Sequence, residues 1–166
     1  EVRVPRIEFV SCWDLYPDPS ATTIEECEYI IHRHKLNRSQ FRALKNLPYF
    51  DKDAIRECLM MGPNYEEKYY ESHLKESENN IEGVENNSYE VLEYWGVMDA
   101  ESAREAGIDL PDEVDELDEV QINAWVADNK ILRAVVNPFT PYRIPYHSFP
   151  YERNPYNFFG IGIAEN

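Results

Sequence analysis

The chain has 166 residues, of which 43% are hydrophobic and 13% aromatic, so its size and composition suit one folded domain with a single core. Its formal net charge is −16, from 32 acidic against 16 basic residues, and this charge repels the phosphates of nucleic acids and anionic lipids. These values argue against a sequence-specific DNA-binding protein. No segment approaches the roughly twenty apolar residues that span a bilayer, so no membrane partner is expected.

Strands and short helical turns are predicted to alternate in the first part of the chain. Residues 7–13 alternate apolar and polar side chains and then meet two prolines, which predicts a strand that ends in a turn. Thr23, with Glu26 three residues later, has the spacing of a capping box for one short helical turn. A strand is predicted to follow over residues 28–35.

Two short helices are predicted next. Asn37 and Gln40 repeat the capping-box spacing at the start of the first helix. The apolar residues after them would form one helical face: Phe41, Leu44 and Leu47. The second helix begins at Asp51 or Asp53 and ends at Gly62, because glycine commonly follows the last helical turn.

Residues 64–87 contain helix formers with a weak apolar face, followed by a loop-like stretch, and the patterns after them are clearer. Residues 88–97 alternate as a strand does. A small helix capped by Asp99 and stopped by Gly107 should follow. Residues 109–119 form an acidic connector.

The last regular element predicted is a hairpin over residues 120–136, with its turn near Asp128 and Asn129. The fold class is therefore α+β, an antiparallel strand meander with several short helices. The apolar strand residues expected to be substantially buried are Trp95, Trp125, Val126, Ile131 and Val135. The following segment, rich in proline and aromatic residues, should take an extended, turning path and be wedged against a further element or subunit.

His32 and His34 are two residues apart on a predicted strand, so both imidazoles would point to the same face, as in a two-histidine metal site. Arg33 and Lys35 flank them, and no carboxylate recurs within the strand to supply a third ligand. We therefore expect both histidines to serve packing or surface hydrogen bonding. No metal site is predicted.

Other patterns have structural explanations. Three aspartates of the connector lack the glycine and ligand order of an EF-hand, and they are Asp112, Asp115 and Asp118. Near the end, "GIGIAE" has Glu165 where a dinucleotide-binding fingerprint has its third glycine. Ser148 lacks the setting of a nucleophile, and no motif links Cys12 or Cys27 to a histidine. The sequence predicts no catalytic or cofactor site.

Three cysteines are present, and their wide spacing matches neither a disulfide framework nor a metal knuckle: Cys12, Cys27 and Cys58. They are expected to be small buried side chains in a reducing cytoplasm. The start, "EVRVPRIEF", has neither a leading methionine nor a signal-like apolar region, so we expect residues 1–166 to be a fragment of a longer polypeptide.

Several stretches in order carry a family resemblance. They are "FVSCWDLYPDPSATTIEECEYIIHRHKLNRSQFRAL", then "YEVLEYWGVMDAE", and finally "VQINAWVADNKILRAVVNPFTPYRIPYHSFPYERNPYNFFGIGIAEN". Their order includes an Ile-His-Arg-His strand, a Tyr-Trp-Gly strand, a hairpin, an Ile-Pro-Tyr strand and a Phe-Gly-Ile-Gly exit. The chain resembles the portal proteins of tailed bacteriophages, specifically the podovirus-like group.

The resemblance implies a structural role in a virion, at the portal vertex of the capsid. Portal proteins form a twelve-subunit ring there. A terminase packages DNA through this ring, the genome later leaves through it, and the tail attaches to it. Residues 1–166 would be a single wing-like domain before the stem. Terminase, capsid and tail-adaptor proteins would be its partners, and DNA would pass without sequence-specific binding. Assembly would take place in the host cytoplasm, from an active phage or a prophage, and no enzyme activity is implied.

Two other classes of protein remain as alternatives. A metal-dependent hydrolase would use His32 and His34 with nearby acids, and it would carry stoichiometric metal. A free-standing acidic interaction module, such as a DNA-mimicking inhibitor, would be encoded as a complete gene.

Overall fold

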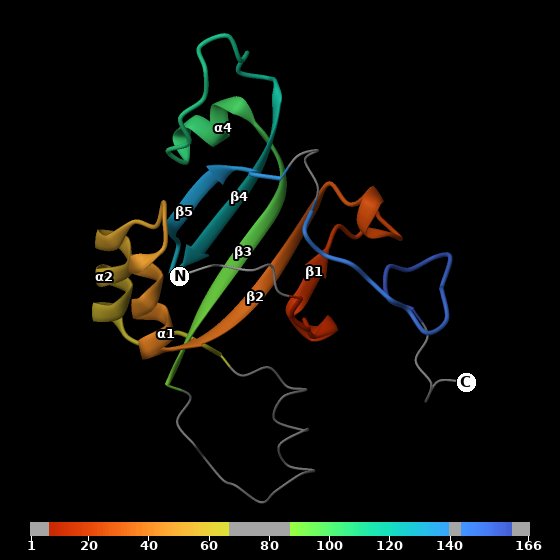
Figure 1. Ribbon diagram of the computed structural model, residues 1–166, viewed down its shortest axis with the longest axis horizontal. Coiled ribbons are helices and arrows are strands. Elements are labelled where there is room, and N and C mark those ends of the chain that lie inside the picture. The colour runs from red at the N-terminus through yellow and green to blue at the C-terminus, as the bar shows by residue number, and fades with distance from the viewer. Residues whose placement is uncertain (1–6, 67–86, 140–143, 161–166) are drawn as a thin grey trace, which may run out of the picture.

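The computed structural model describes residues 7–66, 87–139 and 144–160, and it confirms the α+β class. A five-stranded antiparallel sheet runs in the order β1-β2-β3-β4-β5, so consecutive strands are neighbours (Figure 1). The strands are β1 Leu15–Pro17, β2 Tyr29–Asn37, β3 Ser88–Asp99, β4 Glu119–Ala127 and β5 Lys130–Val136. The helices are α1 Arg38–Ala43, α2 Lys52–Met61 and α4 Ala100–Glu105, and the 3₁₀ turns are η1 Cys12–Asp14, η2 Ile24–Glu26 and η3 Leu44–Asn46.

The two faces of the sheet are covered by different helices. Figure 1 shows α1 and α2 together beside one end of the sheet, whereas α4 lies at the other end. Side chains of β4 alternate between the two layers, because neighbouring strand residues point to opposite faces. Trp125 and Ala127 pack with the apolar residues of α1 and α2, and Ile122 and Ala124 pack with those of α4. We call these faces the α1–α2 face and the α4 face.

The larger core lies on the α1–α2 face. Phe41 of α1 and Ile55 of α2 are almost completely buried there. Phe41 stacks on Tyr89 of β3 with ring centroids 4.7 Å apart. The backbone N–H of Asp51 donates to the carbonyl of Leu132 at 2.7 Å, which fastens the start of α2 to β5.

Helix ends were predicted well because each signal is local. Asn37 and Gln40 form the reciprocal capping box, and Asp51 and Asp99 cap α2 and α4. The capping box predicted at Thr23 was wrong. The side chain of Thr23 caps nothing, and the carboxylate of Glu26 instead accepts hydrogen bonds from the backbone N–H and the hydroxyl of Thr22.

Two strands were placed wrongly. Residues 7–11 form no regular element and Ile7 is fully exposed, whereas β1 begins only at Leu15 and ends at Pro17. The Ile-Pro-Tyr strand is also wrong, because residues 144–146 pair with no strand. Leu47, expected on the face of the first helix, follows η3 and is 39% exposed.

The burial predictions for the sheet are partly right. Trp95 is buried, while Trp125, Val126 and Val135 are half-buried. Ile131 was predicted wrongly, since 43% of it is exposed and Leu132 is buried in its place. The register explains this, because Trp125 faces Arg133 and Val126 faces Ile131, so that β5 holds one extra residue, Leu132.

The hairpin turn is confirmed, and the cysteines are only partly as predicted. The hairpin turn lies at Asp128 and Asn129, which both have positive φ. Cys58 is buried and Cys27 half-buried, but Cys12 is exposed, contrary to expectation. Most of residues 64–87 and the Phe-Gly-Ile-Gly exit from residue 161 onward lie outside the described residues. Among the described helices, none has the length and hydropathy needed to cross a bilayer.

Candidate functional site

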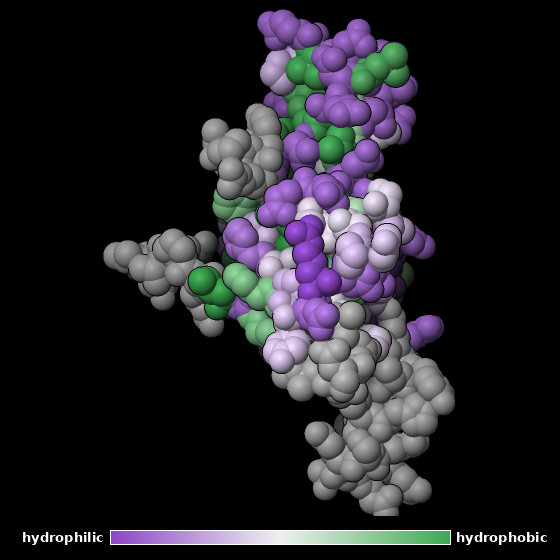
Figure 2. Space-filling view, turned by 90° about the vertical axis from the view of Figure 1, so that its right-hand side faces the viewer, coloured by the Kyte–Doolittle hydropathy of each residue, from purple (hydrophilic) through white to green (hydrophobic). Residues whose placement is uncertain are grey.

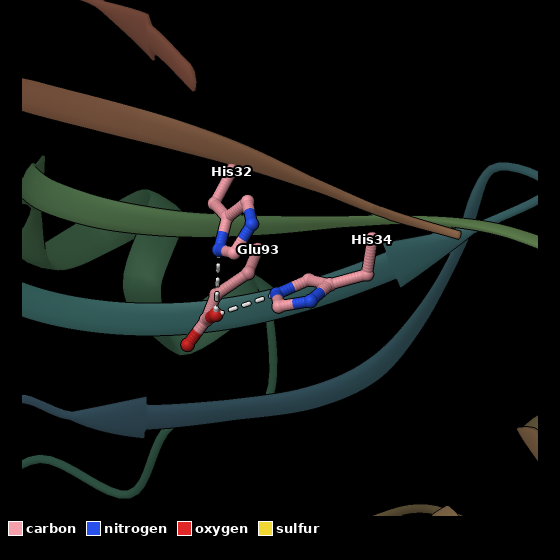
Figure 3. Close-up of side chains that lie close together, drawn as sticks. All are labelled: His32, His34 and Glu93. Atoms are coloured by element: carbon pink, nitrogen blue, oxygen red, sulfur yellow. Dashed lines mark hydrogen bonds and ion pairs between the residues drawn. The ribbon is translucent and has the colours of Figure 1, made fainter. Parts of the chain in front are cut away.

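His32 and His34 lie on the α1–α2 face of β2, and Glu93 of β3 is the direct cross-strand partner of His32. Figure 3 shows the Glu93 carboxylate directed at both imidazoles. Its Oε2 atom is 2.8 Å from Nε2 of His34 and 4.0 Å from Nδ1 of His32. This carboxylate oxygen is therefore hydrogen-bonded to His34 and lies near, but beyond hydrogen-bond distance of, His32.

The other oxygen of Glu93 is held by two donors. Oε1 accepts a hydrogen bond from the indole N–H of Trp95 at 2.8 Å and one from the amide of Asn123 at 3.1 Å. Glu93 is only 8% exposed. Burial raises the pKa of this carboxyl, but hydrogen bonds from His34, Asn123 and Trp95 outweigh burial and hold the pKa below its ordinary value. The group is thus a fixed, buried carboxylate.

His32 is held neutral by its surroundings. Burial, followed by the neighbouring His34, lowers the pKa of His32 to about 4, against the opposing effect of Glu93. Its Nδ1 atom lies 3.0 Å from the hydroxyl of Tyr146, which comes from the segment after β5. Burial raises the pKa of Tyr146, so this hydroxyl stays protonated.

Aromatic and polar side chains of β4 and β5 complete the surroundings. The His34 ring stacks on Trp125 with centroids 4.7 Å apart and an interplanar angle of 14°. Arg133 donates to the side-chain oxygen of Asn123 at 3.0 Å. Two buried donors, Nε1 of Trp125 and Nε of Arg133, have no hydrogen-bond partner among the described residues.

The expectation that no third ligand group accompanies His32 and His34 was wrong. A third ligand group is present, but it comes from β3 rather than from the histidine strand. The ligand atoms of His32, His34 and Glu93 all lie within 4.8 Å of one another. Within the described residues, no other set of His, Cys, Asp or Glu side chains meets this condition, and Asp112, Asp115 and Asp118 do not gather.

A signal for Glu93 was present in the sequence. On β3 the residues that share its face are otherwise aromatic or apolar: Tyr89, Val91 and Trp95. A carboxylate in the middle of such a face must have partners, because burying an unpaired charge is costly. Its partners belong to strands 59 and 30 residues away, so their identity was not readable from local spacing.

A second feature is a basic groove on α1, η3 and α2. Four of its lining residues are cationic: Arg42, Lys45, Lys52 and Arg56. Arg56 pairs with Asp53 at 2.9 Å, and both side chains are largely exposed. Within the described residues, the other three cations have no ion pair. This groove is unusual in a chain of net charge −16.

The acidic connector lies on the α4 face of the sheet. Arg104 of α4 donates to the carbonyls of Pro111 and Val114, and the backbone N–H of Ala100 donates to the carbonyl of Asp118. These bonds fold the connector over α4 and leave its acidic side chains exposed: Asp109, Asp112, Glu113, Asp115, Glu116, Asp118 and Glu119. Figure 2 shows this end of the molecule as mainly hydrophilic, with hydrophobic residues between.

Comparison with known families decides what this architecture belongs to. The model of the phage SU10 portal protein family matches residues 1–166. The chain belongs to that family. A search among curated proteins found no match.

Membership confirms the resemblance to phage portal proteins. Portal proteins are structural components of the phage virion, located at the portal vertex. They assemble as oligomeric rings and associate with capsid and tail proteins. The family is structural, which favours a role other than catalysis for the cluster of His32, His34 and Glu93.

Proposed function

We propose that residues 1–166 are the wing-like domain of a portal subunit, a single domain preceding the stem of a longer polypeptide. The subunit would form a twelve-membered ring through which the terminase packages DNA and to which the tail attaches. Capsid and tail-adaptor proteins would be its other partners, and assembly would take place in the host cytoplasm. The observation that carries this proposal is the match of the portal family along residues 1–166.

The charge distribution supports a head-to-tail contact between neighbouring subunits. The basic groove belongs to the α1–α2 face and the acidic connector to the α4 face, so the two surfaces lie on opposite sides of the sheet. A closed ring repeats one heterologous contact, in which a surface of each subunit meets a different surface of the next. Opposite charges on opposite faces match this requirement. We therefore propose that the connector of one subunit lies against the groove of its neighbour.

Another binding partner for the groove, and two other functions for the chain, are less well supported. The groove could instead contact passing DNA, but its few cations lie in a strongly acidic chain whose field repels phosphates. A metal-dependent hydrolase has the His32, His34 and Glu93 cluster in its favour, yet the family is structural. An acidic interaction module has only net charge in its favour.

The experiment uses the complete portal subunit that contains this chain. Native mass spectrometry and negative-stain microscopy should show a twelve-membered ring. Lys45→Glu combined with Lys52→Glu should weaken ring assembly, and adding Asp112→Lys and Glu113→Lys should restore it, because the attraction is then reversed but kept. Arg153→Glu is the matched control, since Arg153 is an exposed cation in the segment after β5.

Three results would contradict parts of the proposal. A complete subunit that stays monomeric would oppose the ring itself. Rings unaffected by the groove substitutions would oppose only the contact between groove and connector. Loss of DNA retention in assembled particles, with ring assembly unchanged, would assign the groove to DNA instead.

A further inference from the structure

The three side chains at the centre of the α1–α2 face have the composition and spacing of a metal-binding site. Two imidazoles and one carboxylate are a ligand set that suits Zn²⁺, whereas Ca²⁺ and Mg²⁺ prefer oxygen ligands alone. Tetrahedral Zn²⁺, with bonds of about 2.0–2.1 Å, places its ligand atoms about 3.3 Å apart. The two contacts of Glu93 Oε2, 2.8 Å to His34 and 4.0 Å to His32, lie on either side of that separation.

The surrounding side chains hold these groups in place as an outer shell of a metal site does. Metal-binding carboxylates are themselves hydrogen-bonded, which fixes their orientation. Here Trp95 and Asn123 both donate to Oε1 of Glu93. The Oε2 atom is left to face the histidines, as Figure 3 shows. Trp125 fixes the plane of the His34 ring by stacking on it. The ligands are therefore oriented before any ion binds.

The contacts between the three side chains are ones that a metal ion would replace. Nε2 of His34 and Oε2 of Glu93, two of the proposed ligand atoms, are joined by a hydrogen bond of 2.8 Å. The third proposed ligand atom, Nδ1 of His32, lies 3.0 Å from the hydroxyl of Tyr146.

We propose that His32, His34 and Glu93 bind one Zn²⁺ ion, which joins β2 to β3 through three protein ligands and leaves its fourth coordination position to water. This reverses the expectation from the sequence, which considered only the histidine strand. The competing explanation is that the same side chains form a hydrogen-bonded network and nothing more. The two explanations differ in whether the chain takes up zinc.

Zinc uptake by the chain is the test. Protein freed of metal by a chelator is titrated with Zn²⁺ by calorimetry, and with Co²⁺ to record the visible absorption that reports coordination geometry. We expect one ion per chain and a rise in melting temperature on zinc addition, since a ligand that binds only the folded state stabilises it. His32→Ala, His34→Ala and Glu93→Gln should each lower zinc affinity by about tenfold or more.

His147→Ala is the matched control, because His147 is an exposed histidine outside the cluster. Its zinc affinity should equal that of the parent chain. Circular dichroism checks that each variant folds, and His32→Gln and His34→Gln replace any alanine variant that does not. The proposal is overturned if the parent chain takes up no zinc, or if the double histidine variant binds zinc as the parent does. Equal loss in His147→Ala would likewise overturn it.

Discussion

At the scale of single residues, Gly96 shows how closely β2 and β3 approach. A Cβ atom there would lie 2.5 Å from Cβ of Tyr29 and 2.7 Å from the carbonyl oxygen of Glu28. Gly96→Ala should therefore cost about 1–3 kcal/mol or more in the free energy of unfolding, because backbone must move to admit the methyl group. Urea denaturation measures this loss.

At Gly107 the backbone conformation favours glycine, and steric crowding plays no part. A Cβ atom at Gly107 meets nothing within 4 Å, but the residue has a φ of +87°. Gly107→Ala should cost only about 1–2 kcal/mol, the price of a left-handed conformation. A Gly96→Ala variant as stable as the parent would show that β2 and β3 are not this close.

Asp18 holds the turn that leads from β1 toward β2. Its carboxylate accepts hydrogen bonds from the backbone and hydroxyl of Ser20 and from the backbone of Glu28. Those from Ser20 are the main reason why the pKa of Asp18 lies below its ordinary value of 3.8. A carboxyl with a lowered folded-state pKa stabilises the fold above its unfolded pKa and loses that contribution as the pH falls.

Asp18→Asn should accordingly lower stability at neutral pH, and the difference from the parent should shrink as the pH falls through and below about 4. Thermal unfolding between acid and neutral pH measures the difference. Asp112→Asn is the control, since this aspartate is exposed in the connector. A deficit of Asp18→Asn that stays constant with pH would contradict an ionised Asp18 as its source.

Trp125 is a half-buried indole whose N–H has no hydrogen-bond partner within the described residues. Trp125→Ala should cost about 2–3 kcal/mol, below the about 3–5 kcal/mol of a fully buried indole. Trp125→Phe should cost less than half as much, because it removes a buried donor whose lack of a partner costs about 1–3 kcal/mol. Chemical denaturation in a chelator measures both, and equal losses would mean that the N–H is satisfied.

At the scale of elements, the irregular register of β5 decides which residue of the hairpin enters the core. Leu132 is fully buried on the α1–α2 face, while its neighbour Ile131 is 43% exposed. Leu132→Ala should cost about 2–5 kcal/mol and Ile131→Ala well under half of that, because only the first leaves a cavity. Unfolding free energies of the two variants test the register, and the reverse order would place Ile131 inside.

At the scale of the whole molecule, charge should control association. Each copy has a net charge of −16, so like subunits repel one another, and salt screens this repulsion without removing it. We predict that residues 1–166 alone are a monomer or a weak small oligomer at micromolar concentration, whereas the complete portal protein forms rings. The reason is that much of the ring interface would belong to the stem helices.

Light scattering coupled to size exclusion checks this prediction at low and high salt. A stable twelve-membered species from residues 1–166 alone would show that ring closure does not need the stem. A charge-reversed groove variant, Lys45→Glu with Lys52→Glu, provides the comparison for any small oligomer that forms.

The sequence by itself determined the features that rest on local interactions. The caps Asn37 and Asp99 were predicted correctly, and Asp51 was one of the two residues expected to cap α2, because each bonds to a backbone group only two or three residues away. The hairpin turn at Asp128 and Asn129 was correct for the same reason, since these residue types tolerate positive φ. The ordered motifs along the chain were also enough to indicate the portal family.

Only the tertiary structure decided the features that depend on strand pairing over long separations. β1 lies beside β2 at residues 15–17, where Asp14 pairs with the buried Arg33 at 2.6 Å, and not at residues 7–13. Glu93 joins His32 and His34 because β3 pairs with β2 in one register out of many. Register is fixed by the summed burial of whole strand faces, and a shift of one residue would turn Glu93 to the other face. No spacing within a single strand contains that information.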